Sequence, residues 1–207
     1  MKLIVFGATG TVGRHVVDQA LAQGHQVTAF ARAPGALDST DPKLTRAAGD
    51  VLDREAVADA VRGHDAAMVA LGAGRQGTVR SVGTRNVIEA MARDGPRRLV
   101  CLSTLGAGDS RAALNFFWKR IMFGVLLRNA YADHQAQEAA VRESGLDWTI
   151  VRPGAYTDGP ATGAYKHGFP PTERNLKLKI SRADVADFLL RQLTDTAYLR
   201  QAPGLSY

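Results

Sequence analysis

Short apolar runs alternate along the chain with stretches whose apolar residues recur at helical spacing. The apolar runs cover residues 3–6, 27–30, 44–48, 67–71, 99–102 and 148–151. The helical stretches cover residues 12–21, 56–61, 79–91 and 131–145, and each ends at or near a glycine. Buried strands alternating with helices predict an α/β fold, in which helices cover both faces of a doubly wound parallel sheet. Such a sheet binds its ligand at the carboxyl ends of its strands, where the strand order reverses.

The last part of the chain has a different pattern. Residues Leu176–Ile180 alternate strictly between apolar and polar side chains, which predicts a late strand near the sheet edge with one face in solvent. Ser181 with Asp184 three residues later resembles a capping box, so we expect a final helix to begin there. The buried stripe expected for that helix is Val185, Phe188, Leu189 and Leu193.

Length, charge and cysteine content limit the classes of protein to consider. The 207 residues, with no linker or repeat, suit a single domain spanning 1–207. The net charge is +6, but the arginines are scattered, so we expect an anionic small ligand and no nucleic acid. The single cysteine, Cys101, excludes an internal disulfide, and no metal site is expected. Without a signal peptide or a membrane span, we expect a cytoplasmic protein that does not bind a membrane.

A glycine-rich turn follows the first apolar run directly, at the start of the first helical stretch. Its glycines recur every three residues: Gly7 can turn the chain tightly, Gly10 lets the backbone approach a diphosphate, and Gly13 lets the helix pack closely on the strand. Free backbone amides at the helix start would face the phosphates. The turn therefore predicts a dinucleotide site, and a merely tight turn is the alternative. The expected cofactor contacts in the turn are Gly7, Thr9, Gly10, Thr11, Val12 and Gly13.

The end of the second apolar run bears on the choice of dinucleotide. NAD-preferring sites carry a carboxylate there, about twenty residues beyond the glycine turn, to hold the adenosine ribose. This chain has Arg32 near that position and no carboxylate. A guanidinium matches a 2′-phosphate in charge and donor geometry, so we expect NADP(H) as the cofactor. An ordinary surface arginine is the alternative.

Two further strand ends complete the expected cofactor site. Asp50 and Val51 follow the third apolar run and could reach the adenine, whereas Asp53 is expected to cap the next helix. Leu71 and Gly72 end the fourth run, where the backbone can pass close to the ribose or diphosphate.

Several motifs resemble those of the atypical short-chain dehydrogenases, in particular the flavin reductase and biliverdin-IXβ reductase family. They are residues 7–13, Gly49-Asp50-Val51, Ser103-Thr104, Asp133-His134, residues 142–146, Arg152-Pro153-Gly154 and residues 162–165. The resemblance implies a Rossmann-type fold with NADP(H) across the carboxyl edge of the sheet. It also implies that the nicotinamide lies near Thr104, His134 and Pro153.

The catalytic pair of most short-chain dehydrogenases, Tyr-x-x-x-Lys, is missing from this chain. Tyr131 is followed four residues later by Gln135, and neither Tyr156 nor Tyr165 has a lysine at that spacing. The candidate catalytic residues are Thr104 and His134. His134 and Glu138 are spaced to share one helix face, either as an acid–base relay or as a purely structural pair.

The missing pair has a consequence for the substrate. Reduction of an isolated carbonyl creates a localised alkoxide that needs a proton donor. A conjugated acceptor such as a flavin, a quinone or a linear tetrapyrrole spreads the charge over its own π-system. We therefore expect hydride transfer from NADPH to a small planar acceptor, and the alternative is a non-catalytic NADP(H)-binding sensor.

The remaining expectations concern the nicotinamide end. Ser103 and Thr104 could orient the nicotinamide amide or simply satisfy groups at a strand end, and Pro153 with Gly154 could hold the carboxamide. The substrate side is expected to be built from about 105–130 and 153–180. Within it, the aromatic segment Leu114–Phe123 could form a lid, an oligomer contact or ordinary core. We expect a monomer or a small homo-oligomer.

Overall fold

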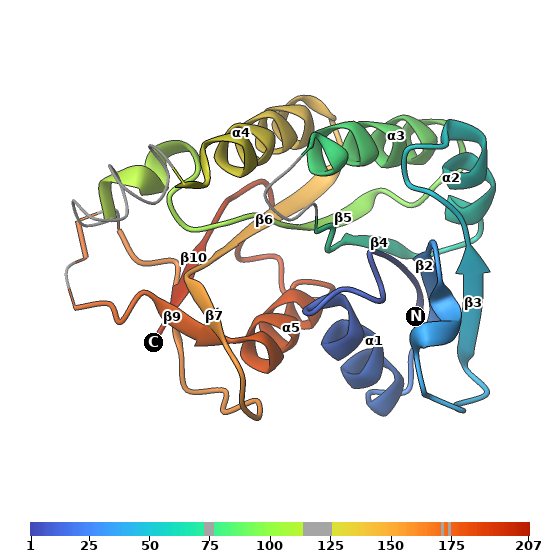
Figure 1. Ribbon diagram of the computed structural model, residues 1–207, viewed down its shortest axis with the longest axis horizontal. Helices are drawn as coiled ribbons and strands as arrows, with labels where there is room; N and C mark the ends of the chain where they lie inside the picture. Colours follow the sequence, from blue (N-terminus) through green and yellow to red (C-terminus); the bar gives the residue numbers. More distant parts are fainter. Residues whose placement is uncertain (73–76, 114–125, 171, 174) are drawn as a thin grey trace.

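The computed structural model describes residues 1–72, 77–113, 126–170, 172–173 and 175–207 (Figure 1). Its centre is an eight-stranded sheet of order β3-β2-β1-β4-β5-β6-β10-β8, parallel except for β8. A separate parallel pair is formed by β7 and β9. The strands are β1 Lys2–Phe6, β2 Gln26–Ala31, β3 Leu44–Ala48, β4 Ala66–Val69, β5 Arg98–Leu102, β6 Asp147–Pro153, β7 Ala155–Thr157, β8 Lys166–His167, β9 Lys179–Ser181 and β10 Gly204–Ser206.

Helices cover both faces of this sheet. The α-helices are α1 Gly13–Ala22, α2 Arg54–Val61, α3 Val79–Asp94, α4 Arg128–Glu143 and α5 Arg182–Arg191, and the 3-10 helices are η1 Pro34–Ala36 and η2 Gly108–Ala113. Side chains alternate along β1, so that Leu3 and Val5 pack against α1 and α5, while Ile4 and Phe6 face α2, α3 and α4. Figure 1 shows these two helical layers above and below the sheet. The Rossmann-type α/β fold predicted from the sequence is confirmed.

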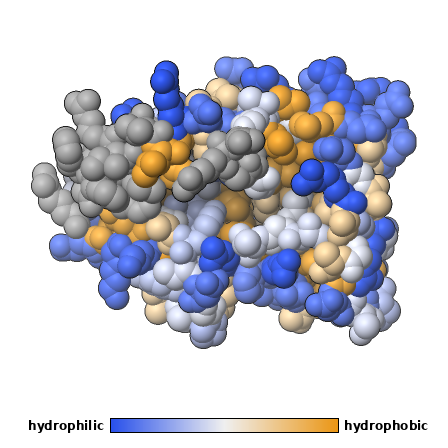
Figure 2. Space-filling view, viewed as in Figure 1, coloured by the Kyte–Doolittle hydropathy of each residue, from blue (hydrophilic) through white to orange (hydrophobic). Residues whose placement is uncertain are grey.

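The strand order reverses at β1, which pairs with β2 on one side and with β4 on the other. The glycine-rich turn lies at the carboxyl end of β1, between the two directions of winding. This is the position at which open α/β sheets bind their ligands. Figure 2 shows hydrophilic side chains around the margins of one face of the molecule and a hydrophobic patch over α3.

The strand predicted at Leu176–Ile180 is wrong in its bounds. Only Lys179–Ser181 forms a strand, and it pairs with β7 outside the main sheet. Leu178 has φ +54°, a left-handed conformation that interrupts an extended strand. The Leu178 carbonyl accepts a hydrogen bond from the Ala155 amide at 2.8 Å, and this contact helps to hold the residue in its unusual conformation.

The predicted cap of the last helix is confirmed, and it has a wider role. The Ser181 hydroxyl accepts a hydrogen bond from the Asp184 amide at 3.0 Å. The Asp184 carboxylate does not turn back to the Ser181 amide. It accepts hydrogen bonds from the backbone amides of Thr162 and Gly163 at 2.7 and 2.9 Å, and from the hydroxyl of Tyr207. One buried carboxylate therefore joins α5, the loop before β8 and the carboxyl terminus.

Replacing Asp184 with asparagine is expected to lower the free energy of unfolding by about 1–3 kcal/mol, because a buried carboxylate loses part of its hydrogen bonding. Burial raises the pKa of this carboxyl, but hydrogen bonds from Tyr207, Gly163 and Thr162 more than offset that effect and hold the pKa below its usual value. The native state thus favours the ionised form. The stabilisation is present above about pH 3.9 and is lost as the pH falls through the native pKa.

Urea denaturation at pH 7 and at pH 3 measures both effects. The difference between wild type and D184N should be smaller at the lower pH. An unchanged difference would show that the ionised carboxylate does not hold the three segments together.

Candidate functional site

A cavity of about 580 Å³ lies at the carboxyl ends of the first four strands, beside the glycine-rich turn. Most of the residues expected to bind a cofactor line it, although they come from four separate segments. The lining residues are Gly7, Thr9, Gly10, Phe30, Ala31, Arg32, Gly49, Asp50, Val51, Leu52, Leu71, Gly72 and Val79. The fold therefore brings the glycine turn, Arg32 and the Asp50 loop into one wall.

The glycines of the turn occupy positions where a side chain cannot fit. Gly7 has φ +82°, and a Cβ atom there would lie 2.5 Å from the Ala70 carbonyl oxygen. A Cβ on Gly13 would lie 2.1 Å from the Gly7 carbonyl oxygen, so α1 starts in direct contact with the turn. α1 has no side-chain cap and no acidic residue in its first turn. The positive end of its dipole is therefore not neutralised from within the helix, as an anion site requires.

Three of the six contacts expected in the turn do not line the cavity. Val12 is buried in the core beside α5, and Gly13 packs against Gly7. Thr11 is exposed. For Val12 in particular, only the backbone amide is left as a group that could face a ligand.

The adenosine end of the cavity is built from the ends of β2 and β3. Arg32 is exposed at the cavity wall, and within the described part of the chain no carboxylate forms an ion pair with it. The Asp50 Oδ1 atom accepts a hydrogen bond from the Leu52 amide at 2.9 Å, which fixes the turn after β3.

The lining residues that were not predicted from the sequence are Phe30, Ala31, Gly49, Leu52 and Val79. A Cβ on Gly49 would lie 2.5 Å from the Phe30 ring, so the ring can pack in the cavity wall only because residue 49 is glycine. Gly49 was visible in the Gly49-Asp50-Val51 motif. The other four gave no local signal.

The residues expected near the nicotinamide are not among those that line this cavity: Ser103, Thr104 and Pro153 lie at the ends of β5 and β6, and His134 lies on α4. Ser103 is buried, and its hydroxyl donates a hydrogen bond to Glu138 Oε1 at 2.7 Å. That hydroxyl is thus committed to a structural contact. The Pro153 carbonyl accepts a hydrogen bond from the Leu105 amide at 2.8 Å, which ties the two strand ends together. Thr104 is half-buried between them.

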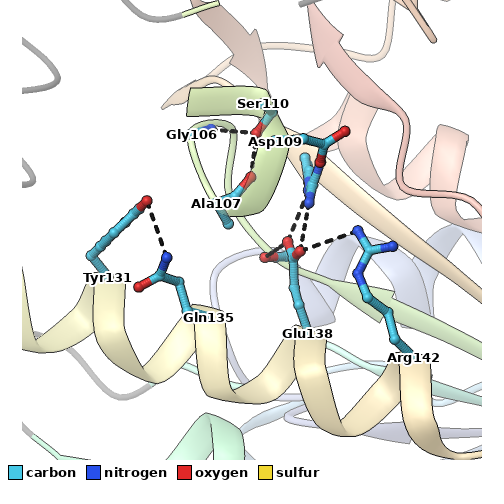
Figure 3. Close-up of polar contacts among 10 residues, drawn as sticks. Gly106, Ala107, Asp109, Ser110, Tyr131, Gln135, Glu138 and Arg142 are labelled. Atoms are coloured by element: carbon cyan, nitrogen blue, oxygen red, sulfur yellow. Dashed lines mark hydrogen bonds and ion pairs between the residues drawn. The ribbon is translucent and has the colours of Figure 1, made fainter. Parts of the chain in front are cut away.

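Glu138 belongs to a buried ionic cluster and not to a relay with His134. It accepts hydrogen bonds from Arg152 Nε at 2.9 Å and from Arg152 Nη2 at 2.6 Å, and the Arg152 side chain is only 1% exposed. Arg152 also contacts Asp109 at 2.6 Å, and this hydrogen bond lowers the pKa of the Asp109 carboxyl. Figure 3 shows Glu138 pointing from α4 toward the turn that carries Asp109. Among the described residues Glu138 is hydrogen-bonded to Arg152 and Ser103 and not to His134, so the expected pairing with His134 is not formed, and a catalytic role of His134 stays a prediction.

His134 lies one helical turn before Glu138 and is neutral at neutral pH. Burial, and next to it the positive charge of Arg80, lowers its pKa to about 4, against weaker opposing effects of Asp133, Gln137 and Glu138. Its Nδ1 atom is buried without a hydrogen-bond partner in the part of the chain that the structure describes. At pH 7 this imidazole can form hydrogen bonds, but almost none of it is in the imidazolium form that could act as a general acid.

The depressed pKa of His134 predicts a pH-dependent contribution to stability. The unfolded chain protonates this histidine near pH 6.5 and the folded chain only near pH 4, so the contribution is full above 6.5 and falls between these values. His134→Gln removes the titrating group. The urea midpoint of the wild type should therefore fall more steeply than that of H134Q between pH 7 and pH 5, and parallel curves would contradict the buried, neutral state.

The position of the missing catalytic lysine is filled by a residue that contacts Tyr131 directly. Gln135 donates a hydrogen bond to the Tyr131 hydroxyl at 3.4 Å, so an amide occupies the position of the missing lysine.

The aromatic segment Leu114–Phe123 lies outside the described residues, and the substrate-side region at 105–130 and 153–180 stays a prediction. No helix in the described ranges has the length and apolar character needed to span a membrane.

Comparison with known proteins shows to which family the chain belongs. Residues 7–196 match the model of a family described as NAD(P)H-binding. The UPF0659 protein YMR090W of Saccharomyces cerevisiae is 30% identical over 93% of this chain and 87% of its own length. Sterol demethylase protein B of Methylococcus capsulatus is 36% identical over 75% of this chain.

The chain spans only 51% of the length of sterol demethylase protein B. Among solved structures, ChuY of Escherichia coli O157:H7, described as an anaerobilin reductase, is 27% identical with a TM-score of 0.81. That alignment covers 100% of this chain and 97% of ChuY. The family match extends from the glycine turn at the cavity to the helix that Ser181 caps, and the chain belongs to the NAD(P)H-binding family.

Proposed function

We propose that the protein is an NADPH-dependent reductase that passes hydride to a conjugated acceptor such as a flavin, a quinone or a linear tetrapyrrole. The observation that carries this proposal is the cavity that runs from the glycine-rich turn to the exposed Arg32. Its shape and donors suit a dinucleotide, and NADPH supplies a hydride from its nicotinamide when bound.

The cofactor would be held mainly by backbone and by one guanidinium. The diphosphate would rest against Gly7, Thr9 and Gly10, where the two glycines leave room for close approach. The start of α1 adds the backbone amides of Thr11 and Val12. Gly13 contributes by allowing the close contact between helix and turn.

The adenosine half would lie between the ends of β2 and β3. Val51, Leu52 and the Phe30 ring offer apolar contact for the adenine, and Leu71 with Gly72 closes the wall from β4. Arg32 would bind the 2′-phosphate, because its guanidinium has no carboxylate partner in the described residues. This charge supports NADP(H) over NAD(H).

The acceptor side supports a substrate that needs no strong acid. Gln135 replaces the lysine that would activate Tyr131, and His134 is neutral at neutral pH. Thr104 and His134 would then orient the acceptor by hydrogen bonds, and the proton would come from water. Ser103 and Pro153 would contribute through the positions of β5 and β6 and not through a free hydroxyl. The likeness to ChuY, which is described as an anaerobilin reductase, supports the tetrapyrrole class.

Absorbance at 340 nm tests this proposal directly. Purified protein is mixed with NADPH and, in separate assays, with FMN, 1,2-naphthoquinone or biliverdin. Loss of NADPH that depends on both protein and acceptor is expected. Tight NADPH binding without turnover on any of these acceptors would instead support the non-catalytic sensor.

A further inference from the structure

The start of α3 holds a buried guanidinium whose hydrogen-bonding capacity is not used up. Arg80 directly follows Val79, which lines the cofactor cavity. Its side chain is 12% exposed, and its Nη1 atom lies 3.5 Å from Asp133 Oδ2. That atom is buried without a hydrogen bond to any described residue. A buried charged donor that lacks a hydrogen bond is costly, so it points to a ligand that accepts from this guanidinium.

Asp133 does not neutralise this guanidinium fully. Its two carboxylate oxygens accept hydrogen bonds from the backbone amides of Arg80 at 3.1 Å and of Ser81 at 2.9 Å. The carboxylate thus caps the first turn of α3, a helix that has no side-chain cap of its own and no acidic residue in its first turn. The Asp133 carboxylate therefore both caps α3 and forms the ion pair with Arg80.

Two groups that are neutral at neutral pH lie in the field of Arg80. Its charge lowers the pKa of His134, whose Nδ1 atom is also buried without a hydrogen bond to any described residue. It also lowers the pKa of the Tyr156 phenol, although burial dominates and raises that pKa to about 12. Arg80, His134 and Tyr156 therefore share one electrostatic neighbourhood, in which the Arg80 guanidinium has an unused donor.

A second cation borders the same tyrosine. The Arg182 guanidinium lies over the Tyr156 ring at 5.4 Å. Its partner is Asp158 at 2.7 Å, whose side chain is 94% exposed, so this ion pair is weak. Arg182 therefore packs on the ring of Tyr156, whose phenol is also in the field of Arg80.

We propose that Arg80, supported by Arg182, binds an anionic substituent of the acceptor, so that the substrate is an acidic conjugated molecule carrying a carboxylate, a sulfonate or a phosphate. This inference rests on the proposed function and adds the charge of the substrate to it. The cofactor's diphosphate is the other possible anion, but the glycine turn already offers it a separate set of donors. The charge of Arg80, in contrast, acts on His134, a candidate acceptor-binding residue, and on Tyr156.

A pair of quinones tests the subsite. The probes are 1,2-naphthoquinone and its 4-sulfonate, which share the reacting ring and differ in one anionic group. The measured quantity is the ratio of kcat/KM for the sulfonate to kcat/KM for the neutral quinone. Comparing this ratio between variants cancels the intrinsic reactivity of the two quinones.

Arg80→Gln is expected to lower this ratio at least tenfold and to change the Kd of NADPH less than threefold. Arg85→Gln is the matched control, because it makes the same change at an exposed position of the same helix, and its ratio should stay at the wild-type value. An unchanged ratio in R80Q would overturn the inference. A weaker Kd for NADPH with an unchanged ratio would also overturn it and would assign Arg80 to the cofactor.

A second variant covers the case in which R80Q does not fold. Arg80→Lys keeps a positive charge beside Asp133 but loses the planar fork of donors. Its ratio should fall at least threefold, and a wild-type ratio would count against the subsite.

A binding measurement separates this inference from the proposed function. The 4-sulfonate is titrated calorimetrically into the complex of the protein with NADP⁺. If neither quinone is turned over but the sulfonate binds to wild type at least tenfold more tightly than to R80Q, the reductase proposal fails and the anion subsite stands. If both quinones are turned over and the sulfonate binds wild type and R80Q equally, the subsite fails and the reductase proposal stands.

Discussion

Replacing Glu138 with alanine is expected to lower the free energy of unfolding by about 3–5 kcal/mol. The reason is that Arg152 is 1% exposed and would keep only Asp109, whose own side chain is 75% exposed, as a charged partner among the described residues. The Ser103 hydroxyl would lose its acceptor at the same time. Breaking one side of a buried ion pair leaves an uncompensated charge, which costs far more than the loss of a surface pair.

The matched control is Glu143→Ala, because Glu143 is an exposed residue near the end of the same helix. The free energy of unfolding of E143A should stay within about 0.5 kcal/mol of the wild-type value. Urea denaturation of both variants gives the comparison. If E138A were as stable as E143A, the cluster would not stabilise the packing of α4 on the ends of β5 and β6.

Replacing Arg32 with alanine is expected to weaken NADPH binding about 10- to 100-fold, the equivalent of about 1.4–2.8 kcal/mol for the loss of a charge-assisted contact with a phosphate. NADH lacks the 2′-phosphate, so its Kd should change less than threefold. Calorimetric or fluorescence titration with both coenzymes measures the two losses.

A substitution at an exposed arginine far from the cavity provides the control for Arg32. Arg62 ends α2 and pairs with Asp59 at 2.9 Å, and Arg62→Ala should leave both dissociation constants unchanged. Equal weakening of NADPH and NADH by R32A would show that Arg32 does not contact the 2′-phosphate.

The sheet and the glycine turn could be predicted because their signals are local. Leu3–Phe6 is an uninterrupted apolar run, and the glycine spacing that follows it has a direct steric meaning at Gly7 and Gly13. The Ser181 cap could also be read locally, since the hydroxyl and the amide that it accepts from are three residues apart. Features whose interactions stay within one or two turns of the chain were therefore accessible from the sequence.

The features that could not be predicted depend on contacts between distant segments. Glu138 was spaced to face His134, but its charge is taken by Arg152, which lies on a different element. β10 has three residues, and its place between β6 and β8 follows from pairing and not from an apolar pattern. The unsatisfied Nη1 atom of Arg80 could not be predicted either, because a guanidinium is recognised as lacking a hydrogen bond only when its surroundings are known.

Calorimetric titration of NADPH into wild-type protein at two temperatures tests the central claim most directly. The claim is that the diphosphate of a dinucleotide binds the glycine-rich turn at the carboxyl end of β1. Two temperatures are needed because burial of apolar surface makes the heat of binding depend on temperature. A heat of binding that happens to be zero at one temperature is therefore not zero at the other. We expect one NADPH bound per chain; no heat at either temperature from well-folded protein would contradict the claim.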